Sequence, residues 1–239
     1  MIWIRSLLYS IFSTITIIIF GVACLFTFPL PFKYRYGFIR QWSRINLWWL
    51  RVCCGLKYRV IGKKNIPESN GIIFCKHQST WETLALQSIF PPQIWVMKKE
   101  LLKVPFFGWG LALLEPIAID RDAGRKALKQ LCDQGKQRLD NGRWVVIFPE
   151  GTRMAPGEKG QYQIGGAMLA SSSGYPVVPM AHNAGYFWPR RQFLKHPGTI
   201  EVRIGKAIDT KGLSARDINK LAEQHIEAMM AEIGEPELH

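Results

Sequence analysis

The fold is indicated most directly by the stretch Ile72-Ile73-Phe74-Cys75-Lys76-His77-Gln78-Ser79-Thr80-Trp81-Glu82. Its first four residues form an unbroken apolar run, which is typical of a buried strand. Residues 83–87, which follow the stretch, favour a helix. We therefore expect His77 at a strand-to-helix turn. In open α/β sheets such turns lie beyond the carboxyl ends of the strands, where ligands bind.

His77 and Glu82 are the candidate chemical pair in this turn. An imidazole can act as a general base when a carboxylate fixes its tautomer and stabilises the imidazolium. Five residues on a straight helix correspond to a rotation of about 500°, so the pair can meet only if His77 precedes the helix and Glu82 lies in its first turn. A purely structural interpretation is a capping box, with Ser79 as N-cap and Glu82 at the third helical position. The spacing leaves both interpretations open.

The rest of the chain alternates between strand-like and helix-like segments. Strands are predicted at 57–61, 72–75, 94–97, 115–121, 144–148, 175–181 and 199–204, and the longer helices at 124–141 and 214–233. This order predicts an α/β fold with a mostly parallel central sheet flanked by helices. Residues 101–110 are unusually apolar for a connection, and they suit either a packed core loop or an apolar wall beside the site.

A second polar turn, Pro149-Glu150-Gly151-Thr152-Arg153, follows the buried strand at 144–148. Glycine allows a backbone to approach a ligand closely, and threonine and arginine side chains bind phosphate oxygens. A Gly-Thr turn after a strand is common, so the motif alone is not specific. His182, His196 and His239 have no partner that the sequence reveals, and we assign them no role.

The chain is strongly basic. Its 239 residues suit one domain with a small appendage, and 31 Lys and Arg against 18 Asp and Glu give a formal charge of +13. Such a surface attracts nucleic acid, an anionic bilayer or phosphorylated substrates. The five cysteines show no CxxC spacing and no clustered histidines, so we expect reduced thiols that face the cytoplasm and no zinc site.

The N-terminus predicts a membrane segment. Residues 6–32 carry no charge and are long enough for a helix of about 20 residues to cross a bilayer. Cations are concentrated after this run, at Lys33, Arg35, Arg40, Arg44 and Arg51, which places the downstream chain in the cytoplasm. Trp and Tyr residues between these cations indicate a second helix in the headgroup zone. A buried soluble helix pair is the alternative, and the choice between a span and a hairpin stays open. We therefore expect membrane-binding helices at 1–56 and an α/β domain at 57–239.

Four segments together resemble the motif blocks of the glycerolipid acyltransferase family. They are His77-x4-Glu82, Ile117–Arg121, Phe148–Arg153 and Val177–Pro179, and the resemblance covers roughly residues 57–205. The order and spacing are most like those of the bacterial 1-acylglycerol-3-phosphate (lysophosphatidic acid) acyltransferases. The commoner family pattern has Asp in place of Glu82 and often Asn in place of Lys76. Glu82 supplies the same carboxylate on a longer stem.

The resemblance implies a reaction and a site. His77 would take the proton from the free 2-hydroxyl of a lysophospholipid, and that oxygen would attack the thioester of acyl-CoA or acyl-carrier protein. Glu82 would orient the ring, with no covalent acyl-enzyme, no bound cofactor and no metal. The phosphate and glycerol would be held by a set of polar residues, and the acyl channel shaped by two apolar ones. The polar set is Arg121, Glu150, Gly151, Thr152, Arg153 and Lys98, and the apolar pair is Val178 and Pro179.

The resemblance also places the chain at the bacterial inner membrane, with its catalytic part facing the cytoplasm. We expect Glu150 to position Arg153 or a glycerol hydroxyl, because a carboxylate beside a phosphate is electrostatically unfavourable. One alternative is the same chemistry on another acceptor, such as a lyso-ornithine lipid or lysophosphatidylglycerol. Another is a non-enzymatic, membrane-tethered protein that binds polyanions, which accounts for the charge but not for two polar turns after buried strands.

Overall fold

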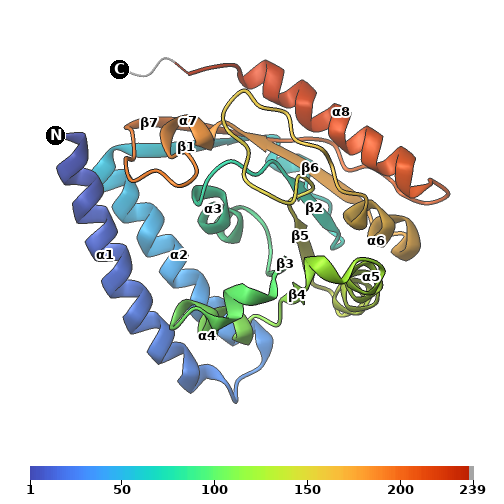
Figure 1. Ribbon diagram of the computed structural model, residues 1–239, viewed down its shortest axis with the longest axis horizontal. Coiled ribbons are helices and arrows are strands. Elements are labelled where there is room, and N and C mark those ends of the chain that lie inside the picture. Colours follow the sequence, from blue (N-terminus) through green and yellow to red (C-terminus); the bar gives the residue numbers. More distant parts are fainter. Residues whose placement is uncertain (237–239) are drawn as a thin grey trace.

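The computed structural model describes residues 1–236, apart from the side chain of Arg121. Its centre is a seven-stranded sheet (Figure 1). The strands are β1 (Leu56–Ile61), β2 (Ile72–Cys75), β3 (Gln93–Lys98), β4 (Ile117–Ile119), β5 (Trp144–Ile147), β6 (Val177–His182) and β7 (Gly198–Ile204). Their order is β1-β7-β6-β2-β5-β3-β4, and every neighbouring pair is parallel except β6 and β7. The predicted α/β class with a mostly parallel sheet is confirmed.

The most apolar strands occupy the middle of this sheet. Every residue of β2 and β5 is buried, and β2 lies between β5 and β6. The turn after β2 therefore leaves the centre of the sheet. Because β7 is antiparallel to β6 and parallel to β1, strand β1 runs opposite to β2. The first residues of β1 thus lie at the edge of the sheet where β2 and β6 end.

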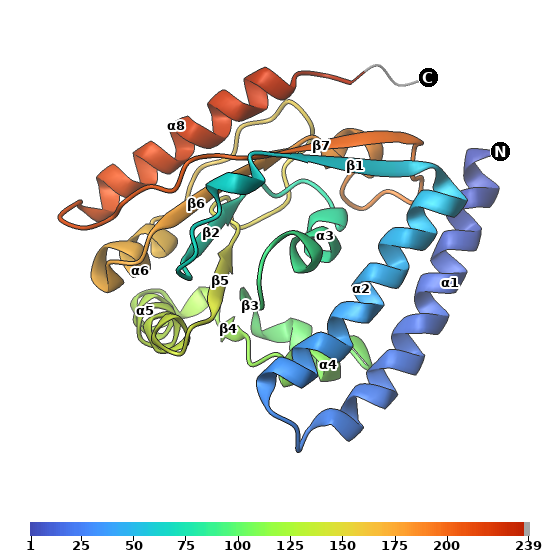
Figure 2. The same cartoon turned by 180° about the vertical axis from the view of Figure 1, so that it is seen from behind.

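Helices cover the two faces of the sheet in separate layers (Figures 1 and 2). One face carries α3 (Trp81–Ile89) and α2 (Phe32–Cys54), and α1 (Ile2–Ala23) packs on α2. The other packs against α5 (Arg125–Asp140), α6 (Gly165–Ser173) and α8 (Ala215–Ile233). The short helices α4 (Phe107–Leu113) and α7 (Ala184–Phe187) complete the set, with 3-10 turns η1 (Cys24–Thr27), η2 (Lys63–Asn65), η3 (Lys99–Lys103) and η4 (Arg121–Ala123).

Helices α1 and α2 form an antiparallel pair joined through η1 (Figure 1). Among the described residues, one helix is long and apolar enough to cross a membrane, over Ile2–Thr27, and only 17% of its most apolar window is buried. A core helix of a soluble protein would be mostly buried, so the exposed apolar surface of α1 suggests membrane association. Helix α2 packs on α1 with one side and on α3 with the other.

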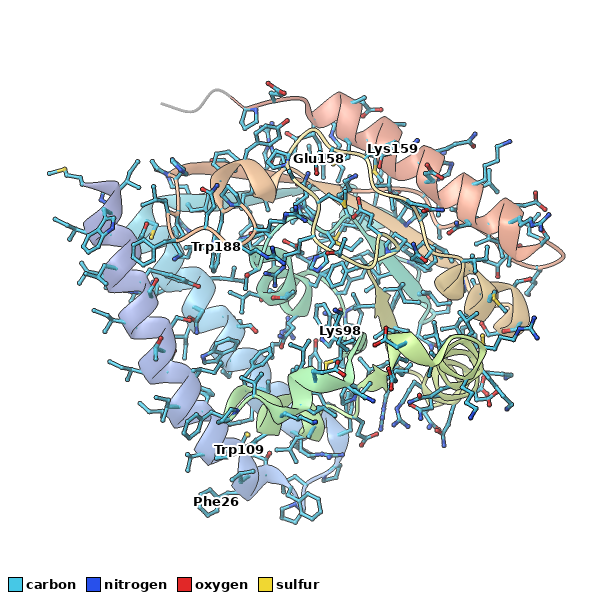
Figure 3. All side chains as sticks on the ribbon, viewed as in Figure 1. Phe26, Lys98, Trp109, Glu158, Lys159 and Trp188 are labelled. Carbon is cyan, nitrogen blue, oxygen red and sulfur yellow. The ribbon has the colours of Figure 1, made fainter. Side chains whose placement is uncertain are left out.

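The apolar connection at 101–110 packs against this helix pair. It forms η3 and the start of α4, and α4 contacts both α1 and η1. A Cβ atom at Gly21 would lie 2.6 Å from the Cβ of Phe106, so glycine is needed for this approach. Trp109 and Phe26 both lie at the η1 end of the helix pair, and both are exposed (Figure 3). The connection is therefore a packed element that extends the apolar surface of the N-terminal helices.

Candidate active site

His77 and Glu82 meet in the turn between β2 and α3. His77 lies two residues after the end of β2, and Glu82 lies in the first turn of α3, which is the arrangement that their spacing required. His77 Nδ1 lies 2.8 Å from Glu82 Oε1; the Glu82 side chain is fully buried, whereas that of His77 is 14% exposed. Because Nδ1 faces a carboxylate, it carries the ring proton of the neutral imidazole, and Nε2 is left with the lone pair that can accept a proton.

Glu82 also holds the backbone of the turn. Its Oε1 accepts the N–H groups of Gln78 (2.9 Å) and Ser79 (2.8 Å). The N-cap residue of α3 is Thr80 rather than the predicted Ser79, whose hydroxyl accepts the N–H of Trp81. Glu82 therefore performs both tasks that the sequence left open, since it orients the ring and binds the backbone before the helix.

The surroundings of Glu82 keep it ionised. Burial acts to raise the pKa of this carboxyl, but His182, His77 and the N–H of Ser79 outweigh burial and lower the pKa below its usual value. A buried carboxylate with three donors stays negative at neutral pH. It can therefore stabilise a positive charge that forms on His77.

The imidazole ring of His77 lies on an aromatic surface. It stacks on Phe148, with ring centroids 3.9 Å apart and an interplanar angle of 15°, and Trp95 lies beside Phe148 at 5.9 Å. Phe148 follows β5, the strand next to β2. The neighbouring strand therefore fixes the plane of the ring, and Glu82 fixes its rotation within that plane.

The second polar turn lies directly against His77. Met154 donates its N–H to the carbonyl of His77 (2.8 Å), and Glu150 Oε2 accepts the N–H of His77 (2.8 Å). Gly151 adopts a left-handed conformation, with φ of 68°, and its N–H donates to the carbonyl of Phe148. Thr152 is exposed and Arg153 is half-buried. The sheet thus brings the predicted base and the predicted phosphate-binding turn together.

Glu150 has a different partner from the one expected. Its Oε1 lies 2.7 Å from Lys76 Nζ, and both side chains are buried. Lys76 Nζ also lies 3.0 Å from Glu227 Oε1 on α8 and donates to the carbonyl of Glu158. Burial raises the pKa of Glu150, although Lys76 opposes that rise. Lys76, and not Arg153, therefore holds the carboxylate of Glu150 in this structure, and a contact of Glu150 with glycerol stays a prediction.

The remaining predicted site residues divide into two groups. Lys98 is exposed at the end of β3 (Figure 3). Because β2, β5, β3 and β4 are parallel, Lys98 lies on the same edge of the sheet as His77, and Arg121 follows β4 there, with its side chain outside the described part of the structure. Val178 and Pro179 are buried inside β6, beside Ile73 and Phe74. Both residues pack within the sheet, and their part in an acyl channel stays a prediction.

His182 is a neighbour of the pair that the sequence did not reveal. It ends β6 and is fully buried; its Nε2 donates to the carbonyl of Lys76 (2.8 Å) and lies 3.8 Å from Glu82 Oε2. Burial lowers the pKa of His182, although the charge of Glu82 opposes that fall, and Nδ1 of His182 accepts the N–H of Ala184. Only its position at the end of a predicted strand hinted that it lies at the active edge.

Metal ligands do not gather at this site. Within residues 1–236, no group of three or more His, Cys, Asp or Glu side chains is arranged to hold a metal ion. The geometry of His77 and Glu82 is suited to acid–base chemistry, and cations lie on the same edge of the sheet.

Comparison with known proteins agrees with this geometry. Residues 57–183 match the family described as Acyltransferase. The chain is 48% identical over 235 residues to a 1-acyl-sn-glycerol-3-phosphate acyltransferase of Pseudomonas aeruginosa, covering 96% of this chain and 91% of that protein. It is 31% identical to a protein of the same name from Saccharomyces cerevisiae, covering 78% of this chain and 63% of the yeast protein.

A solved structure extends the likeness to the whole fold. The crystal structure of the 1-acyl-sn-glycerophosphate (LPA) acyltransferase PlsC from Thermotoga maritima superposes with a TM-score of 0.81 and 25% identity, covering 99% of this chain and 97% of that one. The match includes the N-terminal helices, because nearly all of this chain is covered. The chain is therefore an acyltransferase, and it belongs to the glycerolipid acyltransferase family, within which it resembles the enzymes named 1-acyl-sn-glycerol-3-phosphate acyltransferase.

Proposed function

We propose that this enzyme transfers an acyl group from acyl-CoA or acyl-carrier protein to the sn-2 hydroxyl of 1-acylglycerol-3-phosphate, giving phosphatidic acid. The observation that carries the proposal is the 2.8 Å contact between His77 Nδ1 and Glu82 Oε1 at the end of the central strand. This contact leaves Nε2 as a base, on a ring that stays partly open to an incoming hydroxyl.

The proposed reaction needs no covalent intermediate on the protein. His77 Nε2 takes the proton as the acceptor hydroxyl oxygen bonds to the thioester carbonyl carbon. The tetrahedral intermediate then collapses, the carbon–sulfur bond breaks, and the thiolate takes the proton back from His77. The products are an ester and a free thiol. Glu82 stabilises the imidazolium that exists between these two proton transfers.

The acceptor phosphate has a proposed place on the same edge of the sheet. Arg153 and Thr152 lie in the turn that holds His77 by backbone and side-chain hydrogen bonds, and Lys98 ends the strand beyond β5. Arg121 is proposed as a further cation at the end of β4. Because Lys76 neutralises Glu150, the nearest carboxylate of this turn does not repel a phosphate bound there.

The same proposal includes the membrane. Residues 1–56 would bind the bilayer and residues 57–239 would form the catalytic domain, on the cytoplasmic side of a bacterial inner membrane. The cations that follow the apolar helix support this orientation, and a lipid acceptor requires the site to lie at a bilayer surface. Assays of membranes with lysophosphatidic acid, and with either acyl-CoAs of varied length or acyl-carrier protein, test the acceptor and the donor. Activity confined to a phosphate-free acceptor, such as a lyso-ornithine lipid, would contradict the phosphate assignment.

Arg153→Ala is expected to raise the KM for lysophosphatidic acid by roughly 10- to 100-fold with a smaller change in kcat. A charge-assisted hydrogen bond contributes about 1.5–3 kcal/mol, and this one would act on the bound acceptor as well as on the transition state. Steady-state kinetics with the acceptor varied and the donor saturating measures the effect. Arg216→Ala on the exposed start of α8 is the control, and an unchanged KM in Arg153→Ala would remove this residue from the phosphate site.

A further inference from the structure

A second set of cations surrounds a cavity on the other side of the His77 turn. The cavity has a volume of about 630 Å³ and lies between α2, α3 and the first residues of β1. Figure 2 shows α2 running into β1, with α3 inside the angle between them. The cations that line it are Arg40, Arg44, Arg51 and Lys57, and we call it the α2–β1 cation pocket. None of these residues belongs to the proposed acyl-transfer site.

These cations have no counter-charge. Within the described part of the chain, none of the four forms an ion pair with a carboxylate, and no acidic residue lines the cavity. Neighbouring arginines behave differently, because Arg35 pairs with Glu115 and Arg59 pairs with Glu201. Four unpaired positive charges around one hollow favour an anion as its occupant.

Two buried polar atoms point to the same conclusion. Arg40 Nε and Ser88 Oγ are buried, and neither has a hydrogen-bond partner among the described residues. Both residues line the pocket, one from α2 and one from α3. Buried donors are normally satisfied, and a bound group with several acceptor oxygens would satisfy these two.

Three aromatic side chains, Trp48, Tyr58 and Trp81, line the pocket together with its cations. Trp48 is 56% exposed, and Tyr58 packs edge-on against Trp81 with ring centroids 5.4 Å apart. Trp48 lies on α2, which packs against the apolar helix α1. Tryptophan next to arginine on such a helix is typical of the headgroup zone, where an anionic leaflet supplies phosphate groups. A cavity of this volume is larger than a phosphate needs, so a glycerophosphate with the start of its chains would fit.

We propose that the α2–β1 cation pocket binds the phosphate headgroup of an anionic membrane phospholipid, at a site separate from the acyl acceptor. Trp81 is buried between the pocket and His182, whose ring lies 5.8 Å from it, and Trp81 directly precedes Glu82 in the chain. The bound lipid would therefore lie behind the His77 turn without touching His77. The proposal depends on membrane association but not on the acyl-transfer assignment. An acyl-transfer assay of the same samples therefore shows whether lipid binding in the pocket, acyl transfer at His77 or both have failed.

The test measures binding of dioctanoyl-phosphatidylglycerol to the full chain in detergent micelles by native mass spectrometry. The sn-1 and sn-2 hydroxyls of its diacylglycerol part are both esterified, so it is not a 1-acylglycerol-3-phosphate acceptor of the proposed reaction. Arg40→Gln with Arg44→Gln is expected to weaken binding at least tenfold. The matched control is Arg216→Gln with Lys220→Gln, which removes the same charge from exposed positions on α8, across the sheet, and should bind as the unchanged chain does.

Three outcomes would overturn the proposal. Equal weakening in both double variants would mean that net charge alone attracts the lipid. Equal binding of dioctanoyl-phosphatidylcholine would mean that the anionic charge is not recognised. Displacement of the lipid by adenosine 3′,5′-bisphosphate would assign the pocket to the nucleotide of the acyl donor. If Arg40→Gln disturbs folding, Arg44→Gln with Lys57→Gln changes only exposed side chains and is expected to give the same loss.

Discussion

His77→Ala is expected to lower kcat for acyl transfer by at least about 100-fold, and by as much as about 10⁴-fold, while the KM values for both substrates change little. The imidazole is the proposed acceptor of the hydroxyl proton, and alanine leaves no base at that position. Glu82 cannot replace it, because its carboxylate is fully buried and its pKa is lowered, so it is a weak base. Initial rates with lysophosphatidic acid and an acyl-CoA measure the effect.

The control for this variant is His225→Ala, which removes an exposed imidazole from α8 and should leave kcat unchanged. Thermal unfolding of both variants in micelles shows whether His77→Ala is folded, since it loses the contact of Nδ1 with Glu82 and the stacking on Phe148. A folded His77→Ala protein that keeps more than about a tenth of the kcat would contradict the general-base role.

Much of the fold could be predicted because its signals are local. The strand at 72–75 is confirmed without change, since four consecutive apolar residues in the middle of a parallel sheet form a pattern that few other structures produce. The helix predicted to open at Ser214 does so, because the Ser214 side chain accepts the N–H of Asp217 and caps the first turn. The antiparallel pairing of β6 with β7 carried no local signal, since alternation in a strand does not indicate the direction of its neighbour.

The candidate site also combines contacts that the sequence could predict with contacts that it could not. His77 and Glu82 are five residues apart, so the turn that joins a strand to a helix sets their geometry, and the sequence contained that information. Lys76, Glu150 and Glu227 come together across 151 residues of chain, through two strands and a helix. No spacing rule connects residues at that separation. The sequence therefore did not reveal this partner of Glu150, because Lys76 was known only as a departure from the usual family pattern.

Lys76→Met is expected to destabilise the protein by about 3–5 kcal/mol, because it leaves the buried carboxylate of Glu150 without its cation. Lys76 is 1% exposed and lies 2.7 Å from Glu150 and 3.0 Å from Glu227, so its loss also leaves two carboxylates facing each other. For a chain of this length the loss corresponds to a fall in Tm of roughly 10 °C. Thermal unfolding of the full chain in micelles measures it.

The pH dependence of this loss identifies its cause. The pKa of Glu150 is already raised by burial, and removing Lys76 raises it further, since Lys76 lowers it in the unchanged protein. A carboxyl whose pKa is higher in the folded state than in the unfolded state binds its proton more tightly when folded. Protonation of Glu150 therefore stabilises the folded variant at pH values below the pKa that Glu150 has in the unfolded chain. This stabilisation is lost as the pH rises through the pKa that Glu150 has in the folded chain. The Tm deficit should be small near pH 5 and large near pH 8.

A second substitution separates charge from packing. Lys76→Met with Glu150→Gln removes both members of the ion pair, and the introduced glutamine amide keeps an oxygen that can accept the N–H of His77, as Glu150 Oε2 does at 2.8 Å. Replacing a buried ion pair by neutral groups of similar volume is often close to neutral, so the double variant should recover most of the lost Tm at pH 8. A deficit that is equal at both pH values, or that persists in the double variant, would show that Lys76 acts through the packing of its side chain.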